Sequence, residues 1–483
     1  MIGELKPYST YKDSRVPWLG EVPEHWEIVR GKNLFQCIDI RSQTGEEELL
    51  TVSSERGVIP RKSANVTMFK AESYSGHKLC WPDDLVINSL WAWARGLGVS
   101  KFHGIISTAY GVYRIREKLL NPRYVHELVR SVPFHWELKV RSKGVWTSRL
   151  QLTDDSFLNA PFPVPPDKEQ AAIATFLDYA DRRIRRYIRS KQKLIKLLEE
   201  QKQVVINEAV TRGLDPKVPL KRSGIGWLGD IPEHWELKRL KQLVVRIDQG
   251  VSPQAENYLA ENGRWGVLKA GCVNRGLFQD IQHKRLPVEF AIDPKLVVSL
   301  GDVLVSRASG SPKLVGSVGR VHELNYQLIL SDKTFRPVFG ARVDPEFMVL
   351  AMNSRSYRMQ VEKAISGAEG LANNLPSSSL RTFVFAIPPK HEQEMIVNCV
   401  QEETNSLIKA IRRTEKEISL FQEFRTRLIA DVVTGKLDVR EAAVHLPAEL
   451  DEPEVIIEDD LLDLELDPDA DSDLDAVAED EAA

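Results

Sequence analysis

Apolar residues recur at alternating spacings of three and four over two long stretches of the chain, residues 166–215 and 388–440. This spacing aligns the apolar side chains on one face of a helix, with Glu, Lys and Arg outside it. Each stretch sustains about five heptads and predicts a helix of about 45 residues, roughly 65 Å long at 1.5 Å per residue. Paired prolines precede each stretch, and Gly213 and Gly435 stand where C-terminal caps belong.

The two helices have matching patterns, so we expect them to pair with each other as an antiparallel coiled coil. The apolar residues expected at the contact are Ile184, Ile188, Ile195, Leu198, Leu407, Ile411, Ile418, Phe421 and Leu428. Polar residues also recur at equivalent positions, such as Asp181 with Thr404 and Lys202 with Arg425, and they can fix the register. Antiparallel pairing would carry the two non-helical regions to opposite ends of a rod. The alternative is that each helix packs only on its own domain.

The helices belong to an internal repeat. Residues 18–27 read WLGEVPEHWE and residues 227–236 read WLGDIPEHWE, while PPDKEQ and PPKHEQ precede the two helices. A repeat of this kind indicates a duplicated structural unit. Residues 83–115 and 301–323 mix β-branched and aromatic residues with glycines, as in short strands joined by turns. The sequence therefore predicts an α+β protein with a pseudo-twofold internal repeat.

The predicted organisation is two α/β domains separated by the two long helices. The first domain covers residues 1–165 and the central helix residues 166–215. The second domain covers residues 216–387 and the second helix residues 388–440. The remainder, residues 441–483, is predicted to be an acidic, disordered tail.

Charge is unevenly distributed along the chain. The formal net charge is −4, but residues 449–483 contain 17 acidic residues and no Lys or Arg. In the rest of the chain, 52 of the 69 acidic side chains stand against all 65 Lys and Arg, which leaves about 13 positive charges. A body this basic is suited to a polyanionic partner. The tail either contributes only solubility or shields the body from indiscriminate binding.

Signatures of catalysis are missing from the sequence. GSPKLVGS at Gly310 lacks the spacing and the lysine of a phosphate-binding loop, and no GxGxxG follows a strand. His25 and His234 belong to the repeated decapeptides, which favours a packing or capping role over duplicated catalytic bases. The four cysteines stand far apart, which argues against a zinc site or disulfides. No run of roughly 18 apolar residues predicts a membrane span, and a cytoplasmic location is expected.

Basic and aromatic residues cluster in Gly- and Ser-rich stretches of both domains. The candidates for DNA contact in the first domain are Trp91, Trp93, Arg95, Lys101, His103, Arg141, Lys143 and Arg149. Those in the second domain are Lys269, Arg275, Arg307, Lys313 and Lys333. Lys and Arg neutralise phosphates, and a bidentate Arg can read guanine. Two competing interpretations are a strand that places both tryptophans on one core-facing side, and a plain solvated turn around Arg307.

Taken in this order, the motifs resemble the specificity (S) subunits of type I restriction-modification systems. The resemblance covers residues 12–438 and rests on the doubled WLG-PEHWE, on PPxxEQ before both helices, and on GDVLVSRASGSPKLVG with SDKTFRP in the second domain. It implies two target recognition domains, each reading one half of a split, asymmetric DNA site. It also implies that the helices set the spacer between the half-sites, and that this chain has no catalytic centre and no cofactor.

The resemblance further implies a set of partners. They are double-stranded DNA, two methylation (M) subunits that bind S-adenosylmethionine, and restriction (R) subunits that use ATP and Mg²⁺ and join through the M subunits. No membrane partner is expected. The acidic tail beyond His445 departs from the family pattern. Two alternatives remain open, namely a nuclease or methyltransferase that carries its own specificity, and a coiled-coil adaptor that binds only proteins.

Overall fold

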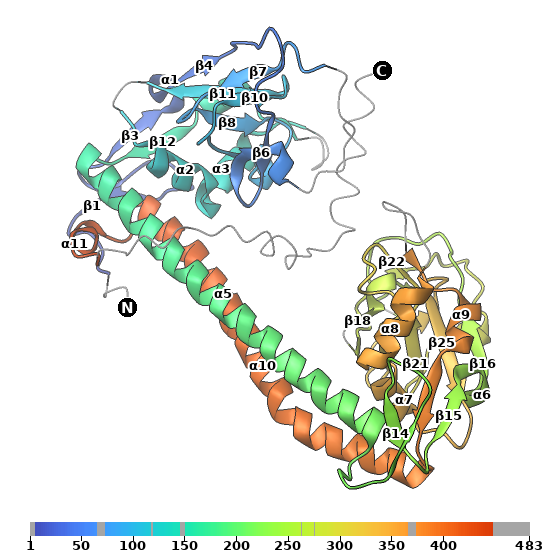
Figure 1. The fold of residues 1–483 in the computed structure, drawn as a ribbon. Coiled ribbons are helices and arrows are strands. Elements are labelled where there is room, and N and C mark those ends of the chain that lie inside the picture. Colours follow the sequence, from blue (N-terminus) through green and yellow to red (C-terminus); the bar gives the residue numbers. More distant parts are fainter. Residues whose placement is uncertain are drawn as a thin grey trace. The chain divides into compact units, whose positions relative to one another are not determined.

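The computed structural model describes residues 5–447 apart from 65–72, 117–118, 145–149, 262, 275 and 366–372. The chain divides into two compact units. Unit 1 comprises Met1–Lys191 with Lys416–Ala483, and unit 2 comprises Gln192–Glu415. Each unit contains a mixed α/β lobe, which we call lobe 1 (residues 5–166) and lobe 2 (residues 213–389). Each also contains part of the long helices α5 (Asp167–Arg212) and α10 (Lys390–Val433), which lie side by side (Figure 1).

Lobe 1 is built on a four-stranded antiparallel sheet in the order β4-β11-β8-β9. Its strands are β4 (Phe35–Ile38), β8 (Leu85–Asn88), β9 (Leu97–Val99) and β11 (Tyr110–Ile115). Successive residues of a strand face opposite sides, so Leu85 and Ile87 join the core under the helices while Val86 faces a second core around Leu50 and Val58. This strand is apolar without alternation because both faces of the sheet are covered.

The other elements of lobe 1 are short. Its helices are α1 (Gly31–Leu34), α2 (Pro122–Arg130), α3 (Val132–Arg141) and α4 (Asp154–Leu158), with 3₁₀ turns η1 (Arg61–Ser63) and η2 (Ala92–Ala94). Its remaining strands are β1 (Tyr11–Asp13), β2 (Glu21–Pro23), β3 (Glu27–Arg30), β5 (Leu50–Ser53), β6 (Gly57–Pro60), β7 (Lys78–Cys80), β10 (Gly104–Ile106) and β12 (Pro161–Val164).

Lobe 2 is built on a six-stranded sheet in the order β16-β25-β21-β23-β19-β18. These strands are β16 (Val244–Gln249), β18 (Val273–Asn274), β19 (Leu277–Phe278), β21 (Val303–Ser306), β23 (Val318–Arg320) and β25 (Thr334–Phe339). In β21, as in β8, alternate residues enter different cores: Val303 and Val305 lie under the helices and Leu304 on the other side.

The rest of lobe 2 surrounds this sheet. Its helices are α6 (Leu240–Leu243), α7 (Pro345–Ala351), α8 (Arg355–Ala364) and α9 (Ser377–Thr382), with 3₁₀ turns η4 (Ala270–Cys272) and η5 (Pro294–Leu296). Its remaining strands are β13 (Leu220–Arg222), β14 (Asp230–Pro232), β15 (Glu236–Arg239), β17 (Trp265–Leu268), β20 (His283–Arg285), β22 (Ala308–Ser309), β24 (Gln327–Ile329), β26 (Asn373–Asn374) and β27 (Val384–Ile387).

The two lobes share one set of elements and differ in what is added to it. The order β4-β11-β8-β9 corresponds to β16-β25-β21-β23. The elements α2, α3, α4, β12 and α5 each begin 223 residues before α7, α8, α9, β27 and α10. Lobe 1 adds the β5–β6 and β7–β10 pairs, whereas lobe 2 adds the sheet β20-β17-β24 and the strands β18 and β19. The α+β fold and its internal repeat are therefore as predicted from the sequence.

The repeated decapeptides hold the first turns of the long helices. Trp26 Nε1 and the Tyr8 hydroxyl donate to Oε1 of Glu169 at 2.7 and 2.5 Å, and His25 Nε2 lies 2.7 Å from its Oε2. In unit 2, Trp235 Nε1 donates to Oε1 of Glu392 at 3.0 Å, and His234 Nε2 lies 2.8 Å from its Oε2. Burial and the Glu169 carboxylate raise the pKa of Tyr8. The His-Trp pairs thus have the packing role that the sequence favours.

The glutamine that follows each of these glutamates fixes the adjoining lobe. Gln170 Oε1 accepts the backbone N–H of Asn121, and Gln393 Oε1 accepts that of Asp344, both at 2.7 Å. Asn121 and Asp344 are the N-cap residues of α2 and α7. Each Glu-Gln pair therefore links one long helix to its decapeptide and to a helix of the adjoining lobe, α2 in lobe 1 and α7 in lobe 2.

The long helices pair in antiparallel orientation within each unit, which confirms the predicted coiled coil. In unit 1, the rings of Tyr187 and Phe421 lie 4.3 Å apart. In unit 2, residues of both helices enter one core cluster, namely Ile206, Ala209, Val210, Ile396, Val397 and Val400. The nine apolar residues predicted at the contact are all buried or half-buried. By contrast, Leu197 and Leu420, which fall outside that pattern, are 62% and 54% exposed.

Two polar pairs lie on this helical contact in unit 1. Asp181 of α5 accepts a hydrogen bond from Arg425 of α10, and Lys191 Nζ lies 2.8 Å from Glu417 Oε2. Since a charged pair at a coiled-coil contact is satisfied in only one alignment, these bonds select the register. At the equivalent place in unit 2, the helix carries Thr404, which is buried and donates to a carbonyl of its own helix. The two halves therefore fix their register differently.

The predicted tail begins later than residue 441. Residues after α10 form α11 (Arg440–Val444), and Ala442, Ala443 and Leu446 pack against the core of unit 1. The apolar side chains of this segment explain why it folds. The acidic residues 449–483 lie outside the described residues. Among the helices of the described ranges, none combines the length and the hydropathy needed to cross a membrane.

Candidate DNA-binding surfaces

The β8–β9 loop (residues 89–96) carries three predicted DNA-binding residues of lobe 1. Trp91 precedes η2, Trp93 lies within it, and Arg95 follows with a φ of +61° that turns the chain back toward β9. Both tryptophans are half-buried and Arg95 is exposed. A Cβ on Gly96 would lie 2.8 Å from the Trp91 carbonyl oxygen, so this tight turn requires glycine. The interpretation as a strand with both tryptophans on one face is therefore wrong, because β8 ends at Asn88.

Lys101 and His103 lie together in the next connection, between β9 and β10. Both side chains are exposed, and the His103 ring lies 5.4 Å from that of Trp81. The β8–β9 loop and this connection lie at opposite ends of β9, and between them they carry most of the basic and aromatic candidates of lobe 1.

The remaining candidates of lobe 1 lie elsewhere. Arg141 is the last residue of α3, and its Nε lies 2.5 Å from Glu137 Oε1 on the same helix. Lys143 is exposed and its backbone pairs with Gln151. Arg149 lies outside the described residues. The structure thus places Arg141 and Lys143 near the end of α3, apart from the β8–β9 loop in sequence and with one guanidinium already bound.

A buried histidine supports β9 from α2. His126 Nδ1 accepts the Val99 N–H at 3.2 Å, and burial, aided by Arg130 and Lys101, lowers the His126 pKa to about 3. Because the unfolded chain binds this proton more readily, the stabilisation is fully present above the ordinary pKa of 6.5 and is lost as the pH falls toward 3. Burial raises the pKa of Glu127 to about 6, so this carboxyl acts in the opposite sense between pH 4.5 and 6.

Replacing His126 by asparagine separates the two effects, because the amide oxygen can accept the same N–H but does not titrate. We expect the stability of the variant relative to the natural protein to rise by about 2 kcal/mol between pH 7 and pH 5, since each pH unit is worth about 1.4 kcal/mol. Denaturant unfolding at several pH values measures this difference. A difference that stays constant with pH would contradict the role of His126.

The β21–β23 loop (residues 307–317) is the counterpart in lobe 2. Arg307 begins it, but Nη1 of Arg307 donates to the Asp332 carbonyl at 2.9 Å and its guanidinium lies 5.9 Å from the Phe335 ring. Its backbone N–H also donates to the Lys333 carbonyl at 2.8 Å. Lys313 is exposed on the same loop. The structure therefore makes Arg307 part of the support of the loop and leaves Lys313 at its surface.

Two other candidates of lobe 2 lie beside this loop. Lys333 is adjacent to Arg307 through the backbone contact just described, and its Nζ lies 3.2 Å from Asp332. Lys269 is the half-buried N-cap residue of η4, a turn that contacts both β21 and β22. Arg275 lies outside the described residues. Lobe 2 thus gathers Lys269, Lys313 and Lys333 around the end of β21.

The sequence did not single out Arg358 of α8, which contacts the β21–β23 loop, or His135 of α3, the equivalent residue of lobe 1. Arg358 binds three carbonyls of the β21–β23 loop. His135 belongs to the helix that packs against η2, and burial, Arg95 and Lys139 lower its pKa. Their partners are backbone atoms or residues distant in sequence. The sequence offered one signal for these two residues: they stand 223 residues apart, at equivalent positions of the repeat.

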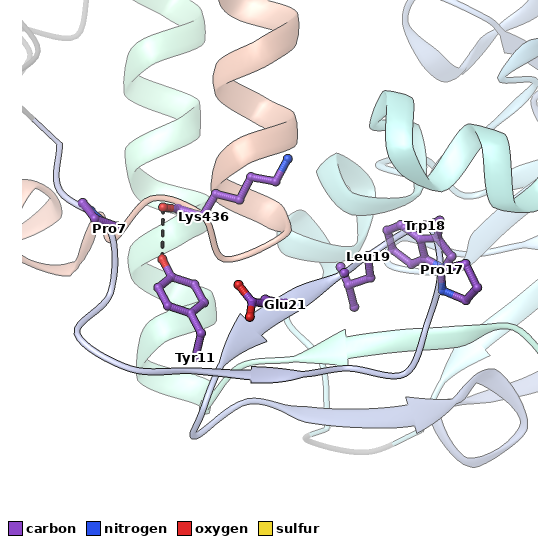
Figure 2. Close-up of a pocket in the computed structure, with 8 residues that line it drawn as sticks. Pro7, Tyr11, Pro17, Trp18, Leu19, Glu21 and Lys436 are labelled. Atoms are coloured by element: carbon purple, nitrogen blue, oxygen red, sulfur yellow. Dashed lines mark hydrogen bonds between the residues drawn. The ribbon is translucent and has the colours of Figure 1, made fainter.

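A groove of about 510 Å³ lies beside the first decapeptide (Figure 2). It is lined by Pro7, Tyr11, Pro17, Trp18, Leu19, Gly20, Glu21 and Lys436. The Tyr11 hydroxyl donates to the Lys436 carbonyl at 3.3 Å. None of the predicted DNA-binding residues lines this groove, which instead separates the decapeptide from the chain that follows α10. Among the described residues, no group of three His, Cys, Asp or Glu side chains is arranged to hold a metal ion.

Comparison with known proteins identifies relatives of this chain. The chain is 25% identical over 431 residues to the type I restriction enzyme MjaVIII specificity subunit of Methanocaldococcus jannaschii, covering 87% of this chain and 94% of that protein. The resemblance to type I specificity subunits is confirmed. The type I EcoEI specificity subunit of Escherichia coli is 26% identical over 211 residues, which span 43% of this chain and 35% of that relative. No family model matches the chain.

A solved structure shares the fold of this chain. It comes from work on complex assembly and conformational transition of the type I R-M system, and it superimposes with a TM-score of 0.57 at 17% identity. The match covers 86% of this chain and 99% of the solved chain. At this level of identity the likeness establishes the fold, namely mixed α/β lobes with paired long helices.

Proposed function

We propose that the chain is the non-catalytic DNA sequence-recognition subunit of a type I restriction-modification complex. The observation that carries the proposal is the combination of shared and unshared elements in the two lobes. The sheets correspond strand for strand over four strands, while the added strands and the loops after β8 and β21 differ. A protein that holds two different readers on one repeated support is suited to an asymmetric, split DNA site.

Each lobe reads one half-site in this proposal. The basic body supplies phosphate contacts that position the lobes, and the β8–β9 and β21–β23 loops supply contacts to base edges. Exposed Arg95 and Lys313 are the loop residues best placed for such contacts. Because phosphate contacts release counterions, the affinity for DNA should fall steeply with salt concentration, by about one log–log slope unit for each phosphate bound.

The paired helices have two roles in this proposal. They set the spacer between the half-sites, and they provide the scaffold for two methylation subunits, through which restriction subunits join. S-adenosylmethionine, ATP and Mg²⁺ then act in those partner subunits in the cytoplasm. Support comes from the length of α5, 46 residues, and from the polar pairs that fix its register with α10.

Two other functions make different predictions. A nuclease or methyltransferase with its own specificity would cut or methylate DNA as a purified chain without partners. A protein-only adaptor would show no DNA binding that weakens with salt. The excess of basic residues in the body favours DNA binding over the adaptor.

Exchanging one lobe tests the proposal. Residues 32–161 are replaced by the corresponding residues of a relative, and the complex is assembled with methylation subunits. We expect one half of the recognised site to change and the other half and the spacer to persist, because lobe 2 and the long helices are retained. Mapping the adenines methylated in random DNA measures the site. The reciprocal exchange of residues 241–384 is the matched control, and changes in both halves from either exchange would contradict modular reading.

A further inference from the structure

Helices α3 and α8 begin with the same serine cap. Ser131 and Ser354 each accept the N–H three residues ahead at 3.4 Å and donate to the carbonyl three residues behind at 2.7 Å. Because the caps match, α3 and α8 begin at equivalent positions of the repeat. His135 and Arg358, four residues after the serines, therefore occupy equivalent positions in the two lobes.

Arg358 binds the middle of the β21–β23 loop. Its Nη1 donates to the carbonyls of Lys313 and Val315 at 3.1 and 2.7 Å, and its Nη2 to that of Pro312 at 3.1 Å. Its Nε lies 3.3 Å from Glu362 on the same helix. A planar guanidinium presents several donors in a fixed arrangement, so it constrains these three carbonyls together.

Other contacts fix the ends of the same loop. The Tyr357 hydroxyl donates to the Gly316 carbonyl at 2.9 Å, and the Leu375 N–H donates to the Arg307 carbonyl at 2.8 Å. With both ends held, the bonds from Arg358 decide the conformation of the segment that carries exposed Lys313. All three acceptors of Arg358 are loop carbonyls. These bonds therefore hold the loop and are not needed to fold the core.

Lobe 1 carries a different residue at the equivalent position. α3 packs against η2 of the β8–β9 loop, and Arg95 of that loop and Lys139 add to burial in lowering the His135 pKa. His135 Nδ1 is buried and has no hydrogen-bond partner among the described residues. A neutral imidazole thus lies at the position that Arg358 fills in lobe 2.

We infer that Arg358 is a positioning residue for the β21–β23 loop, the DNA-reading loop of lobe 2. The inference rests on the proposed function and assigns to that function a residue that need not touch DNA. A loop held in its binding conformation loses less conformational entropy on binding, so its rigidity contributes directly to discrimination between sequences.

The test uses the full chain assembled with methylation subunits, with Arg358→Gln and Arg358→Lys as variants. Arg355→Gln is the matched control, because Arg355 is exposed on the same helix. Dissociation constants are measured for the natural site, for DNA with the lobe 2 half-site scrambled, and for DNA with the lobe 1 half-site scrambled. We expect Arg358→Gln to reduce discrimination at the lobe 2 half-site by about 10- to 100-fold and to leave the lobe 1 half-site unchanged. Arg358→Lys should fall between the natural protein and Arg358→Gln.

Hydrogen exchange provides an independent readout that needs no DNA. The amides of residues 308–317 should exchange about tenfold faster in Arg358→Gln than in the natural protein, with no such change in Arg355→Gln. Unchanged exchange, or an equal loss of discrimination at both half-sites, would overturn the inference. If the natural complex discriminates neither half-site, the proposed function fails, and the exchange rates still decide whether Arg358 holds the loop.

Discussion

Replacing Glu169 by alanine is expected to lower the free energy of unfolding by about 3–5 kcal/mol. Glu169 is only 4% exposed and accepts hydrogen bonds from Tyr8 and Trp26, both buried, and contacts His25. Truncation leaves these polar groups without an acceptor inside the core of unit 1 and opens a cavity at the first turn of α5. Denaturant unfolding followed by tryptophan fluorescence measures the effect.

The repeat offers a matched control for this change. Among the described residues, the contacts of the Glu392 carboxylate are the nitrogens of His234 and Trp235, and Glu392 is 16% exposed, so Glu392→Ala should cost less, about 1–2 kcal/mol. Glu169→Gln keeps one oxygen acceptor and should fall between the two. Equal losses for Glu169→Ala and Glu392→Ala would show that the third contact and the deeper burial of Glu169 contribute nothing.

Lengthening both long helices by one heptad should redirect the complex to a different DNA site. Insertions near Lys196 of α5 and Lys409 of α10 lie opposite each other and preserve the antiparallel contact. Seven residues add about 10 Å and rotate the helix by roughly 20° from whole turns. If the helices set the spacer, affinity for the original site should fall by about a thousandfold or more, toward non-specific binding.

The longer variant should prefer a spacer lengthened by roughly one to three base pairs, a compromise between the added length and the twist of DNA. Both half-site sequences should persist. Selection from a library of spacer lengths, with methylated adenines as the readout, measures the preference. A heptad inserted into α5 alone should instead impair folding, because it misaligns Asp181 with Arg425. A doubly lengthened protein that keeps the original spacer would show that the helices do not determine it.

The long helices were predictable because their signal is local. The three-four spacing of apolar residues defines one face of a helix without any knowledge of distant contacts, and matching patterns indicated the partner. The repeated motifs were also visible, but their purpose was not. Trp26 and Glu169 are 143 residues apart. Only the folded chain shows that, within each half, the decapeptide binds the glutamate of the PPxxEQ motif.

The DNA-binding surfaces were less predictable, for two physical reasons. Residue type does not reveal whether a guanidinium is already bound, and Arg307 proved to contact a carbonyl and an aromatic ring within lobe 2. Arg358 was missed because its acceptors are backbone carbonyls, whose positions depend on loop geometry. The tryptophans at 91 and 93 suggested a strand because their alternation was read without the sharp turn formed at Arg95.

The backbone N–H of Asp438 donates to the carbonyl of Lys6 at 2.8 Å, so the end of the last repeat meets the start of the first. The equivalent junction between the halves, Asp215–Pro216, is an ordinary peptide bond. From Lys6 to Asp438 the chain thus nearly closes on itself, and it is interrupted at one of two equivalent junctions. The order of the two halves along the chain is therefore not essential to the fold. A circularly permuted gene that starts at the other junction would encode a protein with the same fold.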